Sequence, residues 1–111
     1  MRATPEGRVK EAVKRRLKAV GAYYYMPVSN GMGRVGAPDF MVCLGGRFFG
    51  IETKAPGKRG NTTPNQKREL AAIDAAGGIA LVIDDVSQLD DLLETHYDHQ
   101  PKQEGIDTRT S

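Results

Sequence analysis

The sequence predicts an α/β domain in which helices flank a mixed central sheet. Two amphipathic segments begin at Thr-Pro dipeptides, at Thr4 and Thr63, and each ends at glycine, as helices commonly do. Between them, two short apolar runs are separated only by Gly45-Gly46, the pattern of a β-hairpin. A further apolar run at residues 79–83 adds another strand. Helices and strands in this order pack in layers around one sheet.

The first predicted helix runs from Pro5 to about Val20, where Gly21 stops it. Its apolar residues recur every three or four positions and form one buried stripe: Val9, Val13, Leu17 and Val20. Glu6 lies one step back along that stripe, so its carboxylate points toward the core side of the first turn. An acid in the first turn also simply favours the helix dipole.

The middle of the chain predicts strands. Residues 22–28 are aromatic and suit a strand, and the glycine-containing residues 29–36 suit a loop. The hairpin strands are expected at residues 40–44 and 47–53, and both are apolar on both faces, which is typical of a sheet covered on both sides. Cys43 has no partner for a disulfide, and we expect it to be buried in this sheet.

The second half repeats the alternation of helix and strand. Residues 55–61 form a basic loop rich in Pro and Gly, and Thr63-Pro64-Asn65-Gln66 has the capping-box pattern that opens a helix. That helix ends at Gly77-Gly78, and a last amphipathic helix extends from residue 86 to Tyr97. We therefore predict one domain over residues 1–97 and a polar, disordered tail over residues 98–111.

Composition and charge limit the class of protein. A chain of 111 residues has room for one modest core. No apolar run approaches the roughly 20 residues that span a bilayer, and no signal-peptide pattern opens the chain, so we expect an intracellular, cytoplasmic protein without a membrane partner. Residues 1–20 carry seven Lys or Arg against two Glu, although the net charge of the chain is only +2. Such a helix attracts polyanions, but a charged helix is often only a solvated face.

The hairpin brings charged side chains together. The two-residue turn at Gly45-Gly46 fixes the register, which places Asp39 opposite Glu52. Directly opposed residues have Cβ atoms about 4.5–5.5 Å apart on one face of the sheet. Strand alternation places Lys54 on the same face.

Two opposed carboxylates destabilise a sheet unless a cation lies between them. Ligation by oxygen alone favours Mg²⁺ or Mn²⁺ over zinc. The alternative is that Glu52 and Lys54 face solvent at the end of a strand and that Asp39 is a turn residue after Pro38. The spacing alone does not decide between the two interpretations.

Pro38-Asp39, followed after the hairpin by Glu52-Thr53-Lys54, resembles the PD-(D/E)xK nuclease signature. The longer pattern is similar to the VRR-NUC (virus-type replication-repair nuclease) family and covers the chain from Thr4 to about Ile83. It consists of Arg34-Val35-Gly36-Ala37-Pro38-Asp39, Ile51-Glu52-Thr53-Lys54-Ala55-Pro56-Gly57, Thr63-Pro64-Asn65-Gln66 and the glycine pair Gly77-Gly78. The resemblance implies a restriction-endonuclease-like αβββαβ core and a DNA endonuclease that depends on Mg²⁺ or Mn²⁺.

The resemblance also assigns roles to residues. Asp39, Glu52 and the Thr53 carbonyl would bind the metal, with Glu6 contributing directly or through water. Lys54 would position the nucleophile, and Gln66 would lie near the scissile phosphate, although Gln66 is equally explained as the capping-box partner of Thr63. The residues expected to contact DNA phosphates are Lys10, Lys14, Arg34, Lys58, Arg59 and Lys67.

Some members of the family are fused to larger DNA-repair proteins, whereas its small stand-alone members are associated with dimeric cleavage of branched DNA such as four-way (Holliday) junctions. The resemblance therefore implies a homodimer acting on branched DNA, with residues 23–25 and the apolar side of the last helix as candidate interfaces. The resemblance leaves open a virus-encoded protein that acts in a bacterial host. A flap-type or restriction-like endonuclease with the same site is the first alternative. A non-catalytic nucleic-acid-binding module is the second, and the intact Asp39, Glu52 and Lys54 argue against it.

Overall fold

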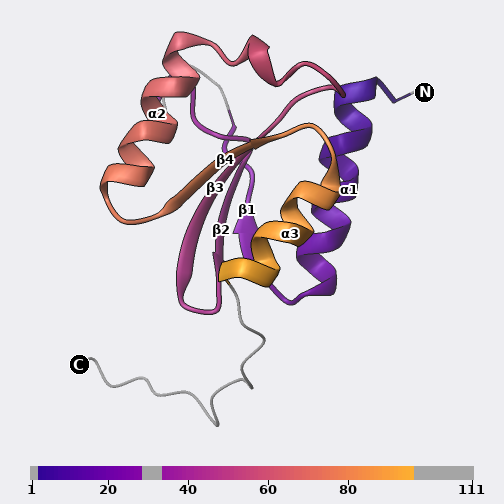
Figure 1. The fold of residues 1–111 in the computed structure, drawn as a ribbon, viewed down its shortest axis with the longest axis vertical. Helices are drawn as coiled ribbons and strands as arrows, with labels where there is room; N and C mark the ends of the chain where they lie inside the picture. Colours follow the sequence, from indigo (N-terminus) through magenta and orange to yellow (C-terminus); the bar gives the residue numbers. More distant parts are fainter. Residues whose placement is uncertain (1–2, 29–33, 97–111) are drawn as a thin grey trace, which may run out of the picture.

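The computed structural model describes residues 3–28 and 34–96 (Figure 1). The predicted tail and Tyr97 lie outside the described residues. Within these ranges, no helix has the length and the apolar character that crossing a membrane requires. The elements follow in the order α1 (Pro5–Ala19), β1 (Tyr23–Tyr25), β2 (Phe40–Leu44), β3 (Arg47–Thr53), the 3₁₀ helix η1 (Arg59–Asn61), α2 (Pro64–Ala75), β4 (Ile79–Ile83) and α3 (Val86–His96).

The four strands form one mixed sheet in the order β1-β2-β3-β4. The pairs β1/β2 and β2/β3 are antiparallel, and β3/β4 is parallel. Leu44 pairs with Arg47 and Phe40 with Ile51, which confirms the register predicted from the Gly45-Gly46 turn. Both turn glycines have positive φ angles, 61° and 79°, as a tight two-residue hairpin requires.

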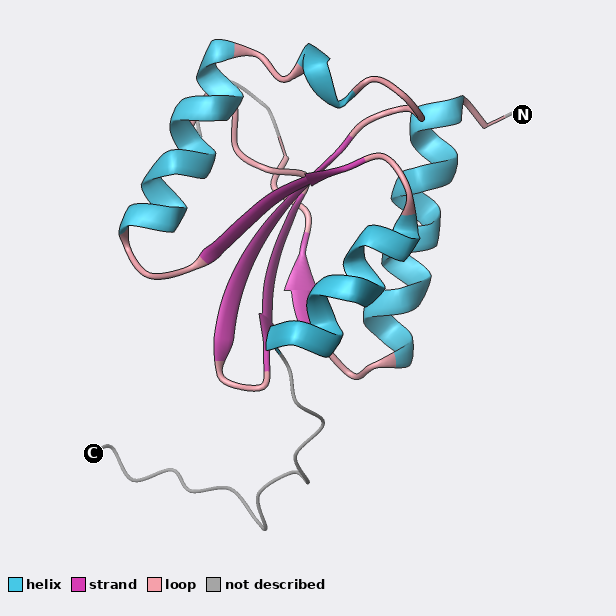
Figure 2. Cartoon of the chain, in the orientation of Figure 1, coloured by secondary structure: helices cyan, strands magenta, loops and turns pink. Residues whose placement is uncertain are grey.

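The first strand is shorter than predicted. Only Tyr23–Tyr25 pairs with β2, so the expected strand over residues 22–28 was too long. Pro27 has no backbone N–H to donate to a sheet, which accounts for the early end. The α/β architecture is otherwise as predicted, with α1 and α3 on one side of the sheet and α2 on the other (Figure 2).

The main core lies between the sheet and the pair α1 and α3. The predicted stripe of α1 faces it, with Val13 and Leu17 almost fully buried. Arg16 of α1 forms an ion pair with Asp90 of α3, which links the two helices at the surface. Among the described residues, the other members of this core are Val9, Phe40, Val42, Leu44, Phe49, Ile51, Ile83, Leu89 and Leu93.

Helix α2 covers the opposite face only in part. It packs over β3 and β4, where a Cβ on Gly50 would lie 2.5 Å from Cδ1 of Ile73. The absence of a side chain at this position therefore lets the helix approach the strand. Toward β1 and β2 the same face is open, and Phe48 is 44% exposed. Cys43 points to this open side and is exposed, so the prediction that it is buried was wrong, as was the expectation of complete cover.

Candidate active site

Three polar residues are buried where β3 ends. Glu52 is 3% exposed, Thr53 is not exposed, and Lys54 is 8% exposed. The backbone N–H of Lys54 donates to the carbonyl of Ile83 at 2.9 Å, which continues the parallel pairing of β3 with β4 for one residue beyond the strand. Burying charged groups at this position is costly unless they have partners. The partners are Asp39, directly before β2, and Gln66 of α2.

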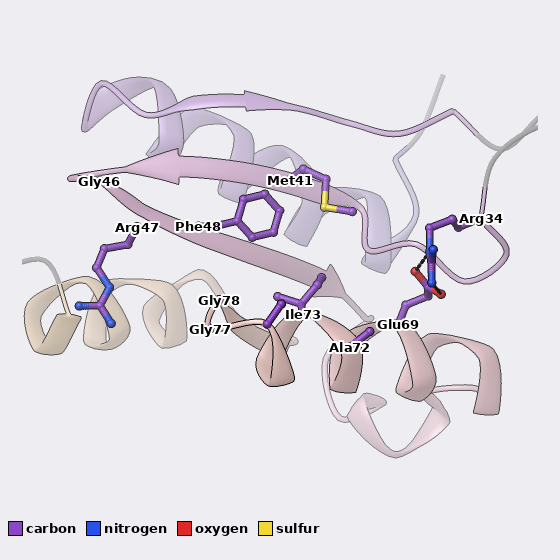
Figure 3. A pocket seen from close by; sticks show the side chains of 11 residues that line it. Arg34, Met41, Gly46, Arg47, Phe48, Glu69, Ala72, Ile73, Gly77 and Gly78 are labelled. Carbon is purple, nitrogen blue, oxygen red and sulfur yellow. Dashed lines mark hydrogen bonds and ion pairs between the residues drawn. The ribbon is translucent and has the colours of Figure 1, made fainter. Parts of the chain in front are cut away.

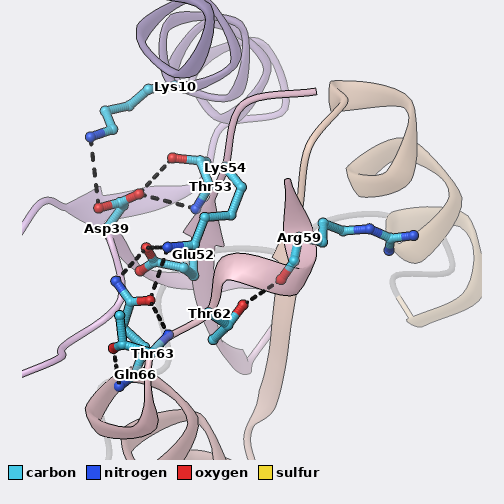
Figure 4. A network of polar contacts seen from close by, with 9 residues as sticks. All are labelled: Lys10, Asp39, Glu52, Thr53, Lys54, Arg59, Thr62, Thr63 and Gln66. Carbon is cyan, nitrogen blue, oxygen red and sulfur yellow. Dashed lines mark hydrogen bonds and ion pairs between the residues drawn. The ribbon is translucent and has the colours of Figure 1, made fainter. Parts of the chain in front are cut away.

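Asp39 is the first partner and lies directly before β2. The last pair of the β2/β3 ladder is Phe40 with Ile51, so the register brings Asp39 alongside Glu52 as predicted. Its Oδ2 atom accepts hydrogen bonds from the backbone N–H of Thr53 at 3.0 Å and from the Thr53 hydroxyl at 2.5 Å (Figure 4). Oδ1 lies 3.7 Å from Nζ of Lys10 on α1. The carboxylate is therefore held in place from both sides.

The carboxylate of Glu52 has one satisfied oxygen and one without a partner. Oε2 accepts a hydrogen bond from Nε2 of Gln66 at 3.0 Å and lies 3.6 Å from Nζ of Lys54. Oε1 is buried and has no hydrogen-bond partner within the described part of the chain. Burial, followed by the charges of Asp39 and Glu6, raises the pKa of Glu52 to about 7, although Lys54 opposes the shift. The described residues therefore satisfy this buried carboxylate only in part.

Gln66 connects the site to the start of α2. Its Oε1 atom accepts hydrogen bonds from Nζ of Lys54 at 2.9 Å and from the backbone N–H of Thr63 at 3.0 Å. The backbone N–H of Gln66 donates in turn to the Thr63 hydroxyl at 3.1 Å, which completes the predicted capping box. The geometry therefore allows both roles considered for Gln66, because the capping side chain also reaches the buried carboxylate.

The donor set fits a hard divalent cation. Within residues 3–28 and 34–94, no three side chains of His, Cys, Asp or Glu gather closely enough to hold a metal unaided. Mg²⁺ needs only one or two carboxylates, because it retains several water ligands. Asp39 and the unpartnered oxygen of Glu52 meet this requirement, whereas zinc prefers several His or Cys ligands. Glu6 is near enough to influence the charge of Glu52.

The residues predicted to contact DNA are dispersed. Lys10 reaches the site at Asp39, as described above, whereas Lys14 pairs with Glu11 on α1 at 3.4 Å. Lys67 is exposed on α2. Arg34 makes a bidentate contact with Glu69, at 2.7 and 3.0 Å, so much of its hydrogen-bonding capacity is already used.

The loop that carries Lys58 and Arg59 is fixed by a residue that the sequence analysis did not single out. Oδ2 of Asp84 accepts a hydrogen bond from the backbone N–H of Gly57 at 2.7 Å, and Oδ1 accepts one from Nε2 of Gln88 at 2.8 Å. The Gly57 N–H contributes most to lowering the pKa of Asp84. Asp84 directly follows β4, at the sheet edge where the parallel β3 also ends. The position of Asp84 directly after the strand predicted at residues 79–83 was the feature of the sequence that could have identified it.

Comparison with known proteins extends these observations. One solved structure, described as a VRR_NUC domain, is 34% identical to this chain, and the match covers 86% of this chain and all of that one with a TM-score of 0.69. Another, described as a VRR_NUC domain protein, matches with the same TM-score at 17% identity, over 88% of this chain and 92% of that one, and supports the fold alone. No protein-family model and no curated protein matches the chain.

Proposed function

The chain belongs to the VRR-NUC family of nucleases, and from this premise we propose that it is a metal-dependent DNA endonuclease whose active site contains Asp39, Glu52 and Lys54. The observation that carries the proposal is the buried Oε1 atom of Glu52, which has no partner in the described chain although Asp39 and Lys54 lie beside it. A carboxylate oxygen in this environment is a ready ligand for a cation. A binding module without catalysis has no need of such an arrangement.

We assign the metal to Asp39, Glu52 and the carbonyl of Thr53, with Glu6 contributing directly or through water. Mg²⁺ or Mn²⁺ suits these oxygen ligands. When bound, the ion would lower the pKa of a coordinated water and neutralise charge on the phosphate. The contacts of Asp39 with Thr53 support the assignment, because they fix the carboxylate beside the backbone of β3.

We propose that Lys54 positions the nucleophile and stabilises the negative charge that develops on the phosphate in the transition state. Its Nζ lies between Gln66 and Glu52, at 2.9 and 3.6 Å, and the side chain is 10% exposed. A cation fixed in a poorly hydrated site stabilises developing negative charge more strongly than one in bulk water. Gln66 acts as a positioning residue in this scheme, because it holds the amine and the carboxylate at once.

The phosphate backbone of DNA is bound by cations around the site. Lys58 and Arg59 are exposed in the loop fixed by Asp84, and Lys10 lies at the mouth of the site beside Asp39. Such contacts give affinity that depends on salt but not on sequence. Lys14 and Arg34 are engaged with Glu11 and Glu69, and we assign these two residues and Lys67 only peripheral contacts.

We further propose that the substrate is branched DNA, such as a four-way junction, and that the protein acts as an isologous homodimer. A two-fold symmetric junction requires paired cuts, and this domain has one site. The apolar residues Leu89 and Leu93 of α3 are buried in the monomer's own core, so α3 is the weaker of the two candidate interfaces. Strand β1, at Tyr23–Tyr25, is the better one, because it is an edge strand of the sheet that the described residues form, and an edge strand can pair with a second copy.

A cleavage assay tests these proposals. Four-way junction, flap and linear duplex DNA of equal length would be incubated with the protein and Mg²⁺ or Mn²⁺, with the Lys54→Ala protein as the control. Preferred cutting of both strands of the junction is the expected result. Preferred cutting of the flap by a protein that light scattering finds monomeric would favour the flap-type alternative. Absence of cleavage of every substrate with either ion would favour the non-catalytic binding module.

A further inference from the structure

The sheet face that carries Glu52 continues into an exposed aromatic surface. We call this surface the open face and define it as Tyr23, Tyr25, Met41, Cys43 and Phe48. Cys43 pairs with Tyr23 on one side and with Phe48 on the other, and Met41 pairs with Tyr25. Paired residues of antiparallel strands share a face, so these side chains form one surface. Tyr23 is 76% and Tyr25 is 57% exposed, values that are unusual for aromatic residues in a sheet.

Toward α2, the open face borders a hollow of about 650 Å³. Met41 and Phe48 point into it from the sheet and Ile73 from the helix (Figure 3). Arg34 and Arg47 lie at its two ends. The carboxylate of Glu69 is shared by Arg34 and by Arg68, whose Nε lies 3.8 Å away, so the surroundings of the hollow carry excess positive charge.

The open face is also close to the active site. Glu52 lies two residues from Gly50 and four from Phe48 on β3, and residues two apart on a strand point to the same side. Asp39 directly precedes β2, two residues before Met41, and with a rise of about 3.3 Å per residue these two residues are about 7 Å apart along the chain. A DNA strand whose scissile phosphate lies at the carboxylates would therefore reach Tyr25 within one or two nucleotides.

From these observations we propose that the open face binds unpaired bases of the DNA substrate by stacking. The inference rests on the proposed function, because branched DNA offers unpaired bases beside the cleaved strand. Tyrosine and phenylalanine rings stack on any base, so the site would accept single-stranded DNA without sequence preference. Arg47 would contact its phosphates. A second copy of the chain docked on the face itself would cover the approach to Asp39, whereas pairing through the edge of β1 would leave the face accessible.

The single cysteine provides a direct probe of this surface. Cys43 lies between Tyr23 and Phe48 and is exposed, so its rate of reaction with a thiol reagent reports whether the face is covered. The full-length protein would be tested in EDTA, without cleavage, against oligothymidylate and against a duplex of equal length. We expect single-stranded DNA to protect Cys43 and the duplex to protect it little. Equal protection by both would overturn base stacking.

Removal of the Tyr25 ring, followed by measurement of the affinity for oligothymidylate, is the second test. We expect Tyr25→Ala to weaken binding of oligothymidylate about tenfold and Tyr25→Phe to restore it, because stacking needs the ring and not the hydroxyl. Val28→Ala, which removes a 76% exposed apolar side chain close to β1, is the matched control and should change little. Unchanged affinity in Tyr25→Ala would overturn the proposal.

Two further outcomes separate this proposal from its rivals. Protection of Cys43 that rises with protein concentration in the absence of DNA would show that a second copy covers the face, and would overturn the proposal. Protection by oligothymidylate that depends on Tyr25, in a protein that cuts none of the branched substrates, would support the base-binding surface while refuting the proposed nuclease specificity.

Discussion

Gln66 donates a hydrogen bond from Nε2 to Oε2 of Glu52 at 3.0 Å, while its Oε1 atom caps the first turn of α2. One side chain thus joins the start of a helix to the buried carboxylate of the candidate site. The usual capping box only satisfies free N–H groups at a helix end. Here the same amide also fixes Lys54, so the start of α2 and the proposed catalytic groups are positioned together.

The two roles of Gln66 can be separated by comparing Thr63→Ala with Gln66→Ala. Thr63→Ala removes the cap and should lower the free energy of unfolding by about 1 kcal/mol, with turnover nearly unchanged. Gln66→Ala should lose similar stability and, in addition, about tenfold or more in turnover, because misplaced catalytic groups are costly. Urea denaturation and single-turnover cleavage measure the two effects. Equal turnover in the two variants would limit Gln66 to capping.

Lys54→Ala should abolish cleavage while leaving the binding of metal and DNA largely intact. Nζ of Lys54 contacts Glu52 and Gln66 but is not a metal ligand in the proposed scheme. Removal of one fixed stabiliser of transition-state charge commonly costs about 100-fold or more in rate. Lys18→Ala, an exposed lysine in the last turn of α1, is the control. Comparable turnover in Lys54→Ala and the wild type would remove Lys54 from the mechanism.

Asp39→Asn should weaken the binding of Mg²⁺ or Mn²⁺ without unfolding the metal-free protein. The amide oxygen can still accept the hydrogen bonds of Thr53, but it brings no charge to the metal. Loss of the charge also removes one of the causes that raise the pKa of Glu52. Titration calorimetry measures the metal affinity, and thermal unfolding in EDTA controls for the fold. Unchanged metal affinity would show that the proposed site is wrong.

The hairpin and the placement of the candidate site residues were predictable because both follow from local rules. A two-glycine turn fixes the register of β2 and β3, and alternation then places Asp39, Glu52 and Lys54 together. The capping box at Thr63 is equally local. The packing of the neighbouring helix does not follow from local rules. The part of the sheet face that α2 covers depends on the length and the crossing angle of the helix. Cys43 was misassigned for that reason.

Interactions between distant parts of the chain were likewise not predictable from local patterns. Asp84 fixes Gly57 across 27 residues of sequence, and Arg34 pairs with Glu69 across 35. In the sequence, Asp84, Arg34 and Glu69 are only three charged residues among many. Parallel pairing of β3 with β4 creates the first contact, because it brings the two strand ends to one edge of the sheet. Tertiary arrangement therefore decides which charged residues become partners.

The metal-free protein should lose stability as the pH rises from about 5 to 8. The pKa of Glu52 is raised from 4.5 to about 7 in the folded protein, so the folded state retains a proton that the unfolded chain releases in this window. The contribution of Glu52 to the free energy of unfolding is therefore largest below pH 4.5 and is lost as the pH rises through 7. This contribution is at most about 3 kcal/mol. The lowered pKa values of Glu69 and Asp84 place their titration below this window.

Urea denaturation in EDTA across this pH range measures the effect, and Glu52→Gln is the matched variant. The variant should show a flatter pH dependence than the wild type, because its amide does not titrate. Added Mg²⁺ should stabilise the wild type at pH 8 and have little effect on Glu52→Gln. Parallel pH profiles of the two proteins would show that Glu52 does not carry a raised pKa.

Asp84 should control the order of the basic loop and, through it, the affinity for DNA. Its carboxylate accepts the N–H of Gly57, lies 3.7 Å from Nε of Arg59, and is fixed in turn by Gln88. Gly57 has a φ angle of 81° in a turn closed by the bond from Lys58 N–H to the Ala55 carbonyl at 2.9 Å. Asp84→Ala removes the acceptor that holds this turn against the end of β4.

Limited trypsin digestion measures the order of the loop directly, because Lys58 and Arg59 are cleavage sites within it. Loss of a charge-assisted hydrogen bond should raise the rate of cleavage there about tenfold, since local opening becomes easier. DNA affinity should fall more than turnover, because the phosphate contacts are displaced while the carboxylates stay in place. Asp85→Ala removes the neighbouring, exposed carboxylate and is matched in charge. Equal digestion rates in the two variants would show that Asp84 does not fix the loop.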